Sequence, residues 1–147
     1  MKRLGNQQLV RLLTSIAWVG GVMCLLAIFV GPAWYHLIHV RGLRADIEDA
    51  TMAIAKAQQN ELVVRERFLP FDTRSRKAAD FSSSTDATGW LKDQRLVLSG
   101  WQQQNGNFLI RVVTRPEVIE KQWLPAILLE RELDSSGKTV RMKWVEG

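Results

Sequence analysis

The side chains that could do chemistry in this chain are few. The two histidines, His36 and His39, are three positions apart, so a helix would place both on one face. The one cysteine, Cys24, lies in an apolar stretch and has no second cysteine for a disulfide. A metal site needs more ligands than two imidazoles, and none is nearby in the sequence. We therefore predict no metal site and expect the histidines to pack or contact headgroups at a membrane surface.

Motifs of the common enzyme classes are also missing. The sequence has no G-x-S-x-G elbow, no H-E-x-x-H, no phosphate-binding glycine loop and no paired-cysteine metal spacing. Its 147 residues leave room for one ordinary domain, or for a smaller domain with an extended segment. We therefore expect a protein that is not an enzyme, with no catalytic residue and no cofactor.

One stretch of the chain is long, apolar and uncharged. From Leu12 to Val40, 29 consecutive positions, there is no Asp, Glu, Lys or Arg, although 24% of all residues are charged. A helix over Leu12–Trp34 would rise about 1.5 Å per residue and cover a hydrocarbon layer of about 30 Å. A helix buried in a soluble core is disfavoured, because so short a chain could not surround it. We predict a transmembrane helix over residues 12–35, with Trp18, Cys24, Trp34 and Tyr35 as membrane-anchor residues.

A cleaved signal peptide is the alternative to a retained span. Lys2 and Arg3 precede the apolar stretch, and Gly31-Pro32-Ala33 supplies small residues near its end. Signal cores usually have about 7–15 apolar residues, and this stretch is longer, which favours a retained helix. The basic residues before the span place residues 1–11 in the cytoplasm. We predict a single-pass protein of a bacterial inner membrane, in contact with lipid, with its C-terminal part in the periplasm.

Residues 36–68 have the pattern of a helical stalk. Eight of nine heptad a and d positions counted from Val40 are apolar. Either this seam pairs in trans as a coiled coil, or it folds back onto the C-terminal domain as an ordinary amphipathic helix. We favour pairing in trans, because the first turns have nothing else to pack on and Glu61 suits a partner that offers a base. The predicted interface residues are Val40, Leu43, Ile47, Ala50, Ile54, Ala57, Glu61, Val64 and Phe68.

Residues 69–85 are predicted to be a linker. Pro70 ends the preceding helix, because proline lacks an amide hydrogen. The basic cluster Arg74, Arg76 and Lys77 is typical of a solvated segment. From Ala78 onward nine basic residues balance nine acidic ones, so we expect no direct contact with nucleic acid.

Residues 86–147 have the pattern of a small α+β domain. A short helix with Asp86 as a candidate N-cap precedes two extended runs, 95–103 and 107–114, and Asn105-Gly106 between them is a strong hairpin signal. A second helix follows near Pro116, with Thr114 as a candidate N-cap.

Because of Pro125, the sequence allows two secondary structures for the segment up to Leu133. The helix either kinks there and continues to Leu133, or it ends and Ile127–Leu133 is a strand, which we favour. With a last strand over Thr139–Val145, the predicted order is αββαββ, a small ferredoxin-like sheet with helices on one face. Of four tryptophans in this domain, we predict that two anchor an interface: Trp101 and Trp144.

This layout resembles the PilO and GspM families, the single-span assembly-platform proteins of type IV pili and type II secretion, including their short HofO-like relatives linked to the use of DNA. The segments that carry the resemblance are Leu69-Pro70-Phe71, Ser99-Gly100-Trp101 with Asn105-Gly106, Trp123-Leu124-Pro125 and Val140–Val145. The linker over residues 72–85 departs from the family pattern, because it is basic and rich in serine.

The resemblance implies a non-enzymatic inner-membrane scaffold. Its expected partner is a PilN-like or GspL-like single-span protein, together with a PilP-like periplasmic protein, and the stalk would form a homodimer or a heterodimer. A cell-division scaffold with one span and a periplasmic coiled coil is the alternative, although such proteins are mostly helical.

Overall fold

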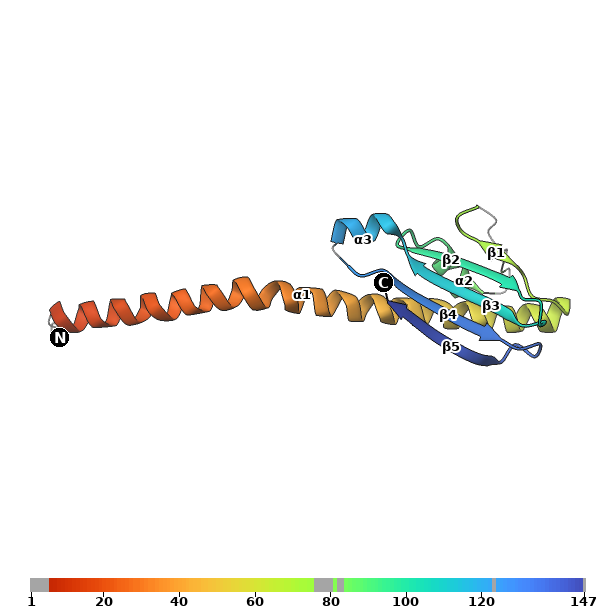
Figure 1. The fold of residues 1–147 in the computed structure, drawn as a ribbon, viewed down its shortest axis with the longest axis horizontal. Helices are drawn as coiled ribbons and strands as arrows, with labels where there is room; N and C mark the ends of the chain where they lie inside the picture. Colours follow the sequence, from red (N-terminus) through yellow and green to blue (C-terminus); the bar gives the residue numbers. More distant parts are fainter. Residues whose placement is uncertain (1–5, 76–80, 82–83, 123, 147) are drawn as a thin grey trace. The chain divides into compact units, whose positions relative to one another are not determined.

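The computed structural model describes residues 6–75, 81, 84–122 and 124–146, in two compact units, Met1–Ile38 and His39–Gly147. The predicted residues Lys2, Arg3, Arg76, Lys77 and Trp123 lie outside this description. The α+β class is confirmed by the elements, which are labelled in Figure 1: α1 (Asn6–Arg65), β1 (Phe71–Asp72), α2 (Thr85–Leu91), β2 (Leu96–Gln102), β3 (Phe108–Thr114), α3 (Pro116–Gln122), β4 (Ile127–Leu133) and β5 (Thr139–Glu146).

The first unit contains residues 12–38 of the uncharged stretch, all of them helical. Every residue from Gln7 to Ile38 is exposed, and the exposed fraction of the residue surface reaches 75% at Phe29. A single helix that presents apolar side chains all round is unfavourable in water and stable in hydrocarbon, where its backbone groups are paired internally. Within the described residues, α1 is the one helix long and apolar enough to cross a membrane.

The sheet of the second unit is an antiparallel meander. Its strand order is β1-β2-β3-β4-β5, so each strand pairs with its neighbours in the chain. The predicted order αββαββ is confirmed by α2 to β5, and Ile127–Leu133 is a strand. The Asn105-Gly106 hairpin is also confirmed, with φ of 87° at Gly106.

The ferredoxin-like arrangement is not confirmed. A helix that crosses over in such a fold joins parallel strands. Here α3 connects β3 with β4, and these two strands pair antiparallel. The local pattern of helices and strands therefore agrees with the expectation, while the pairing of the strands differs from it.

Helix α1 covers the inner face of the sheet. The buried apolar side chains of residues 43–68 and the inward side chains of the strands belong to one hydrophobic core (Figure 1). The strand members of this core are Phe71, Leu96, Leu98, Phe108, Ile110, Val112, Ile127, Leu129 and Leu133. Burial of this face removes a large apolar area from water, which is the main favourable term in folding the unit.

The seam predicted to pair in trans is therefore occupied within the chain. Ile47 and Ile54 are fully buried, and they pack in the same core as the strands. The physical reason is that an apolar sheet face needs a cover, and α2 and α3 have only seven residues each. The alternative of an amphipathic helix folded onto the C-terminal domain is what the structure has, and residues 39–65 are part of that domain.

Part of the predicted linker also belongs to the core. Phe71 and Phe81 are 3% and 2% exposed, and their rings pack edge to face with centroids 5.9 Å apart. Phe71 pairs with Gly100 across β1 and β2. Arg74 is exposed, as a solvated basic residue should be.

Two predicted N-cap residues are wrong, although α2 and α3 begin at Thr85 and Pro116, close to the predicted starts. Ser84, and not Asp86, caps α2, because its Oγ accepts a hydrogen bond from the backbone N–H of Ala87 at 3.3 Å. Thr114 does not cap α3. It is buried at the end of β3, where its Oγ1 accepts from the N–H of Ile127 at 3.1 Å and so links β3 to β4.

Candidate functional site

The predicted membrane-anchor residues lie on the exposed surface of α1 in the first unit. The exposed fractions are 73% for Trp18, 62% for Trp34 and 58% for Tyr35, and Cys24 is exposed as well. Aromatic rings flanking an apolar helix suit the headgroup regions of a bilayer. The four residues therefore fit the surface of a helix that meets lipid.

The predicted coiled-coil residues divide into a buried set and one exposed member. Val64 is 74% exposed, close to the end of α1 at Arg65. Six of the others belong to the core of the second unit: Leu43, Ile47, Ala50, Ile54, Ala57 and Phe68. Val40 packs against this core, and Glu61 is buried.

Glu61 has an ion-pair partner in its own helix. It is 2% exposed, and its Oε2 lies 3.0 Å from Nε of Arg65, although this contact lacks hydrogen-bond geometry. The base that we expected from a partner is therefore supplied by the chain itself, four residues further along.

The two tryptophans predicted at an interface both have cationic neighbours. Trp101 is half-buried on the outer face of β2, where the guanidinium of Arg111 lies 5.1 Å from the ring centroid. Trp144 packs against the core from β5, and the guanidinium of Arg44 lies 5.8 Å from its ring. Cation–π contacts of this kind hold the rings in place.

Strand β5 forms one edge of the sheet and is the first candidate interface. It pairs with β4 on one side and has no neighbour on the other among the described residues (Figure 1). Three of its apolar side chains are exposed: Val140 at 56%, Met142 at 45% and Val145 at 39%. An edge strand presents unpaired backbone N–H and C=O groups, so this edge can accept another strand.

The edge is also basic. Arg141 and Lys143 are exposed on the outer face, opposite Glu132 and Glu130 of β4. Within the described part of the chain, neither cation forms an ion pair. Both acids are engaged elsewhere: Glu130 binds Arg111 at 2.6 Å, and Glu132 accepts from the side-chain amide of Asn107 at 2.7 Å.

A third cation lies on the inner face beside the same edge. Arg131 is only 8% exposed, and its Nη2 lies 3.5 Å from Sδ of Met142 while Nε has no hydrogen bond among the described residues. Burial lowers the pKa of Arg131, and the charge of Glu48 opposes this effect. The cations of β5 without an ion pair among the described residues are therefore Arg141 and Lys143, both on its outer face.

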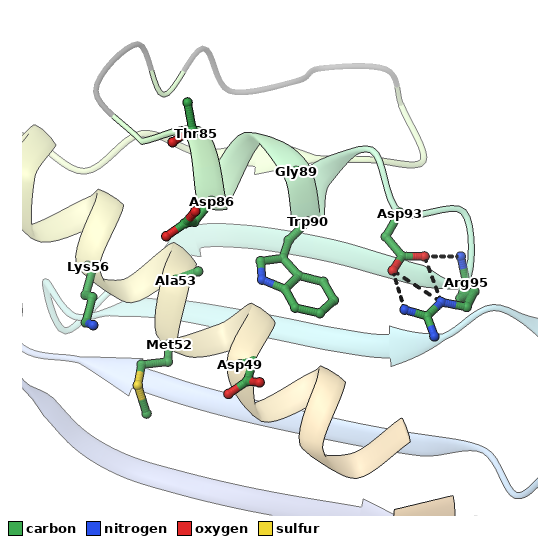
Figure 2. Close-up of a pocket in the computed structure, with 10 residues that line it drawn as sticks. All are labelled: Asp49, Met52, Ala53, Lys56, Thr85, Asp86, Gly89, Trp90, Asp93 and Arg95. Carbon is green, nitrogen blue, oxygen red and sulfur yellow. Dashed lines mark hydrogen bonds and ion pairs between the residues drawn. The ribbon is translucent and has the colours of Figure 1, made fainter. Parts of the chain in front are cut away.

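A groove between α1 and α2 is the second candidate (Figure 2). Its volume is about 660 Å³, and it is lined by Asp49, Met52, Ala53, Lys56, Thr85, Asp86, Gly89, Trp90, Asp93 and Arg95. Figure 2 shows the indole of Trp90 pointing from α2 toward α1. The groove is open and mixed in polarity, which suits a contact surface better than an enclosed ligand site.

Arg95 closes one end of this groove and is already engaged. Its guanidinium lies 2.9 Å from Oδ2 of Asp46 and 2.8 Å from Oδ2 of Asp93. The hydrogen bond from Arg95 lowers the pKa of Asp93, although partial burial acts in the opposite direction. Arg95 therefore links α1 to the loop before β2 and is not available to an anion.

The basic edge was missed by the sequence reasoning, although a signal for it exists. In Thr139–Glu146 cationic and apolar residues alternate, which indicates a strand with one polar face. What the alternation does not reveal is that β5 lies at an edge, because this depends on the order of all five strands.

The described residues contain no group of three or more His, Cys, Asp or Glu side chains that could hold a metal ion.

The fold defines the structural class of the molecule, which combines one long apolar helix with a small antiparallel α+β domain. Comparison with known proteins adds no family to this class: no family model matches the chain, and no curated protein or solved structure matches it significantly.

Proposed function

We propose that the protein is a membrane-anchored, non-enzymatic scaffold that joins a second membrane protein through the edge strand β5. The observation that carries this proposal is the eight-residue edge strand itself, whose outer edge is unpaired among the described residues and which exposes the apolar side chains of Val140, Met142 and Val145. The apolar helix of the first unit supports the membrane anchor.

Edge strands are usually protected, because they pair with other chains when they are long and flat. At the opposite edge, β1 is only two residues long. A β-bulge lies near Leu133, at the start of the β4–β5 pairing, and beyond it the strand runs regularly from Arg141 to Glu146. A regular segment of this length is sufficient for a partner to add a strand.

The resemblance of the sequence to the PilO and GspM families suggests which assembly this is. We place the protein in a type IV pilus or type II secretion platform of a bacterial inner membrane, with the N-terminus in the cytoplasm. The partner is a PilN-like or GspL-like single-span protein, with a PilP-like periplasmic protein as a further member. Because the seam of α1 is buried in its own domain, contact through β5 replaces the coiled coil expected from the sequence.

The test is affinity purification of the full chain from native membranes, with two matched variants. Met142→Asp places a charge on the edge strand, and Val63→Asp places one on α1 at a side chain that is 83% exposed. Wild type and Val63→Asp should recover the same single-span protein of the PilN or GspL type. Met142→Asp should lose it by at least about tenfold, as expected when a contact of roughly 1.4 kcal/mol or more is removed.

Alkaline extraction of the membranes provides the control for insertion, and all three proteins should remain in the pellet. Undiminished recovery by Met142→Asp would contradict docking through β5. Recovery of no membrane protein of this type by the wild type would contradict the assembly we propose.

A further inference from the structure

We infer that the segment that binds β5 is an extended strand from a different protein, in which apolar residues alternate with Asp or Glu. This inference deepens the proposed function and depends on it, because it names the chemistry of the partner at the same edge. It follows from the two faces of β5, from the charges on them, and from the like charges that two copies of β5 would place opposite each other.

The two faces of β5 require different side chains opposite them. The register places Met142 and Trp144 opposite the inward residues Arg131 and Leu129, so both belong to the inner face. Arg141 and Lys143 alternate with them on the outer face. Side chains directly opposite one another in an antiparallel pair lie on the same face. A partner strand would therefore place apolar residues against Met142 and Trp144, and other residues against the two cations.

Those other residues should be acidic. Arg141 and Lys143 form no ion pair within the described ranges, and the nearest acids across the strand are bound to Arg111 and Asn107. Opposite charges facing each other across strands stabilise a pair by about 0.2–1 kcal/mol, and like charges destabilise it. Arg141 and Lys143 therefore favour a partner with carboxylates on the outer face.

A second copy of this chain does not meet that requirement. If two β5 strands pair antiparallel around Met142, Arg141 of one copy faces Lys143 of the other. If they pair around Arg141 or around Lys143, that residue faces its own copy. Each central register therefore places like charges directly opposite each other. The basic residues disfavour self-pairing in these registers and favour an acidic partner, which is how edge charges commonly control association.

The inference can be tested with synthetic peptides and the full chain in detergent micelles. One peptide alternates valine with glutamate over eight residues, the length of β5, and the other alternates valine with lysine. Fluorescence anisotropy of the labelled peptides measures binding. The acidic peptide should bind at least about tenfold more tightly than the basic one, and the difference should shrink as salt is added. N-methylation of alternate residues along one edge of the acidic peptide should abolish binding, because β-pairing needs those amide hydrogens.

The charge-reversed variant Arg141→Glu/Lys143→Glu should prefer the basic peptide. Its control is Arg67→Glu/Arg74→Glu, which changes the net charge equally at two exposed residues outside β5 and should keep the preference of the wild type. Equal binding of both peptides, binding of neither, or reversal by the control variant would each overturn the inference. So would a dimer of this chain joined through β5. If Met142→Asp still loses the membrane partner while the peptides fail, docking at the edge stands and its acidic chemistry does not.

Discussion

The side-chain amide of Gln58 forms two hydrogen bonds with the backbone of Leu69. Nε2 donates to the carbonyl oxygen of Leu69 at 2.7 Å, and the N–H of Leu69 donates to Oε1 at 2.9 Å. Gln58 is fully buried on α1, eleven positions earlier in the chain. This pair fixes the chain where it leaves α1 and turns toward β1, and it satisfies two backbone groups that burial would otherwise leave unpaired.

Replacing Gln58 by Glu should make stability depend on pH in a defined direction. An ionised carboxylate cannot donate to the carbonyl of Leu69, so the variant should lose about 2–4 kcal/mol of unfolding free energy near pH 8. Burial raises the pKa of this Glu above its unfolded value of about 4.3. The stability of the variant relative to wild type should therefore be greatest below about pH 4 and fall as pH rises through the higher folded pKa.

Denaturant unfolding of the full chain between pH 4 and 8, always compared with wild type at the same pH, measures this effect. Gln59→Glu is the matched control. Gln59 is exposed and donates one hydrogen bond, to the carbonyl of Gly137 at 2.6 Å, so its replacement should cost less and depend little on pH. If the loss of unfolding free energy in Gln58→Glu does not change with pH, the role that we assign to the Gln58 amide is contradicted.

Gly100 should not tolerate even a methyl group. A Cβ there would overlap the ring of Phe71 and lie 2.9 Å from Cε1 of Phe108, two side chains that are held by the core. We expect Gly100→Ala to lower the unfolding free energy by about 1–3 kcal/mol.

Gly89 supplies the control, because a Cβ at this position of α2 would meet no atom within 4 Å. Gly89→Ala should be neutral or stabilising by up to about 1 kcal/mol, since alanine favours a helix over glycine. Thermal unfolding of both variants measures the difference. Equal melting temperatures would show that the aromatic cluster around Gly100 is looser than described.

Two members of the same heptad seam should behave differently. Ile54 is fully buried and Val64 is 74% exposed. Ile54→Ala should therefore cost about 2–5 kcal/mol, through lost burial and a cavity, whereas Val64→Ala should change stability by less than about 0.5 kcal/mol. If the seam instead paired with another helix in trans, both variants would weaken that association and neither would greatly change the unfolding of the domain.

The contact between Asp93 and Arg95 should contribute to stability only at pH values where the Asp93 carboxyl is ionised. The pKa of Asp93 is lowered in the folded state, so its contribution is complete above the unfolded value of about 3.9 and is lost as pH falls through the lower folded pKa. Asp93→Asn should be less stable than wild type at pH 7, by less than about 1 kcal/mol because solvent screens this partly exposed pair. The difference in unfolding free energy between wild type and Asp93→Asn should disappear as pH falls through the lowered pKa of Asp93. A difference in unfolding free energy that persists at low pH would contradict an electrostatic origin of the stabilisation by Asp93.

The order of elements in the second unit could be predicted because its signals are local. Asn105-Gly106 determines a hairpin, and Ile127–Leu133 alternates well enough to be recognised as a strand after Pro125. The partner of the α1 seam could not be predicted in the same way. A heptad pattern requires an apolar neighbour, and it does not distinguish another helix from the inner face of a sheet.

The same limit explains the other differences. The burial of Phe81 is not visible in a segment that reads as a basic, serine-rich linker, because it depends on contact with Phe71 ten residues away. The open edge of β5 depends on antiparallel pairing of β3 with β4, whereas a crossover would have altered the strand order. Both are consequences of long-range contacts that no local pattern determines.

Photo-crosslinking in living cells tests the central claim, docking through β5, most directly. A photoreactive amino acid replaces Met142 in the full chain, and separately Val63, whose side chain is also exposed. We predict an adduct with a second membrane protein from the Met142 position and none from Val63. No adduct at Met142, or equal adducts from both positions, would contradict the account.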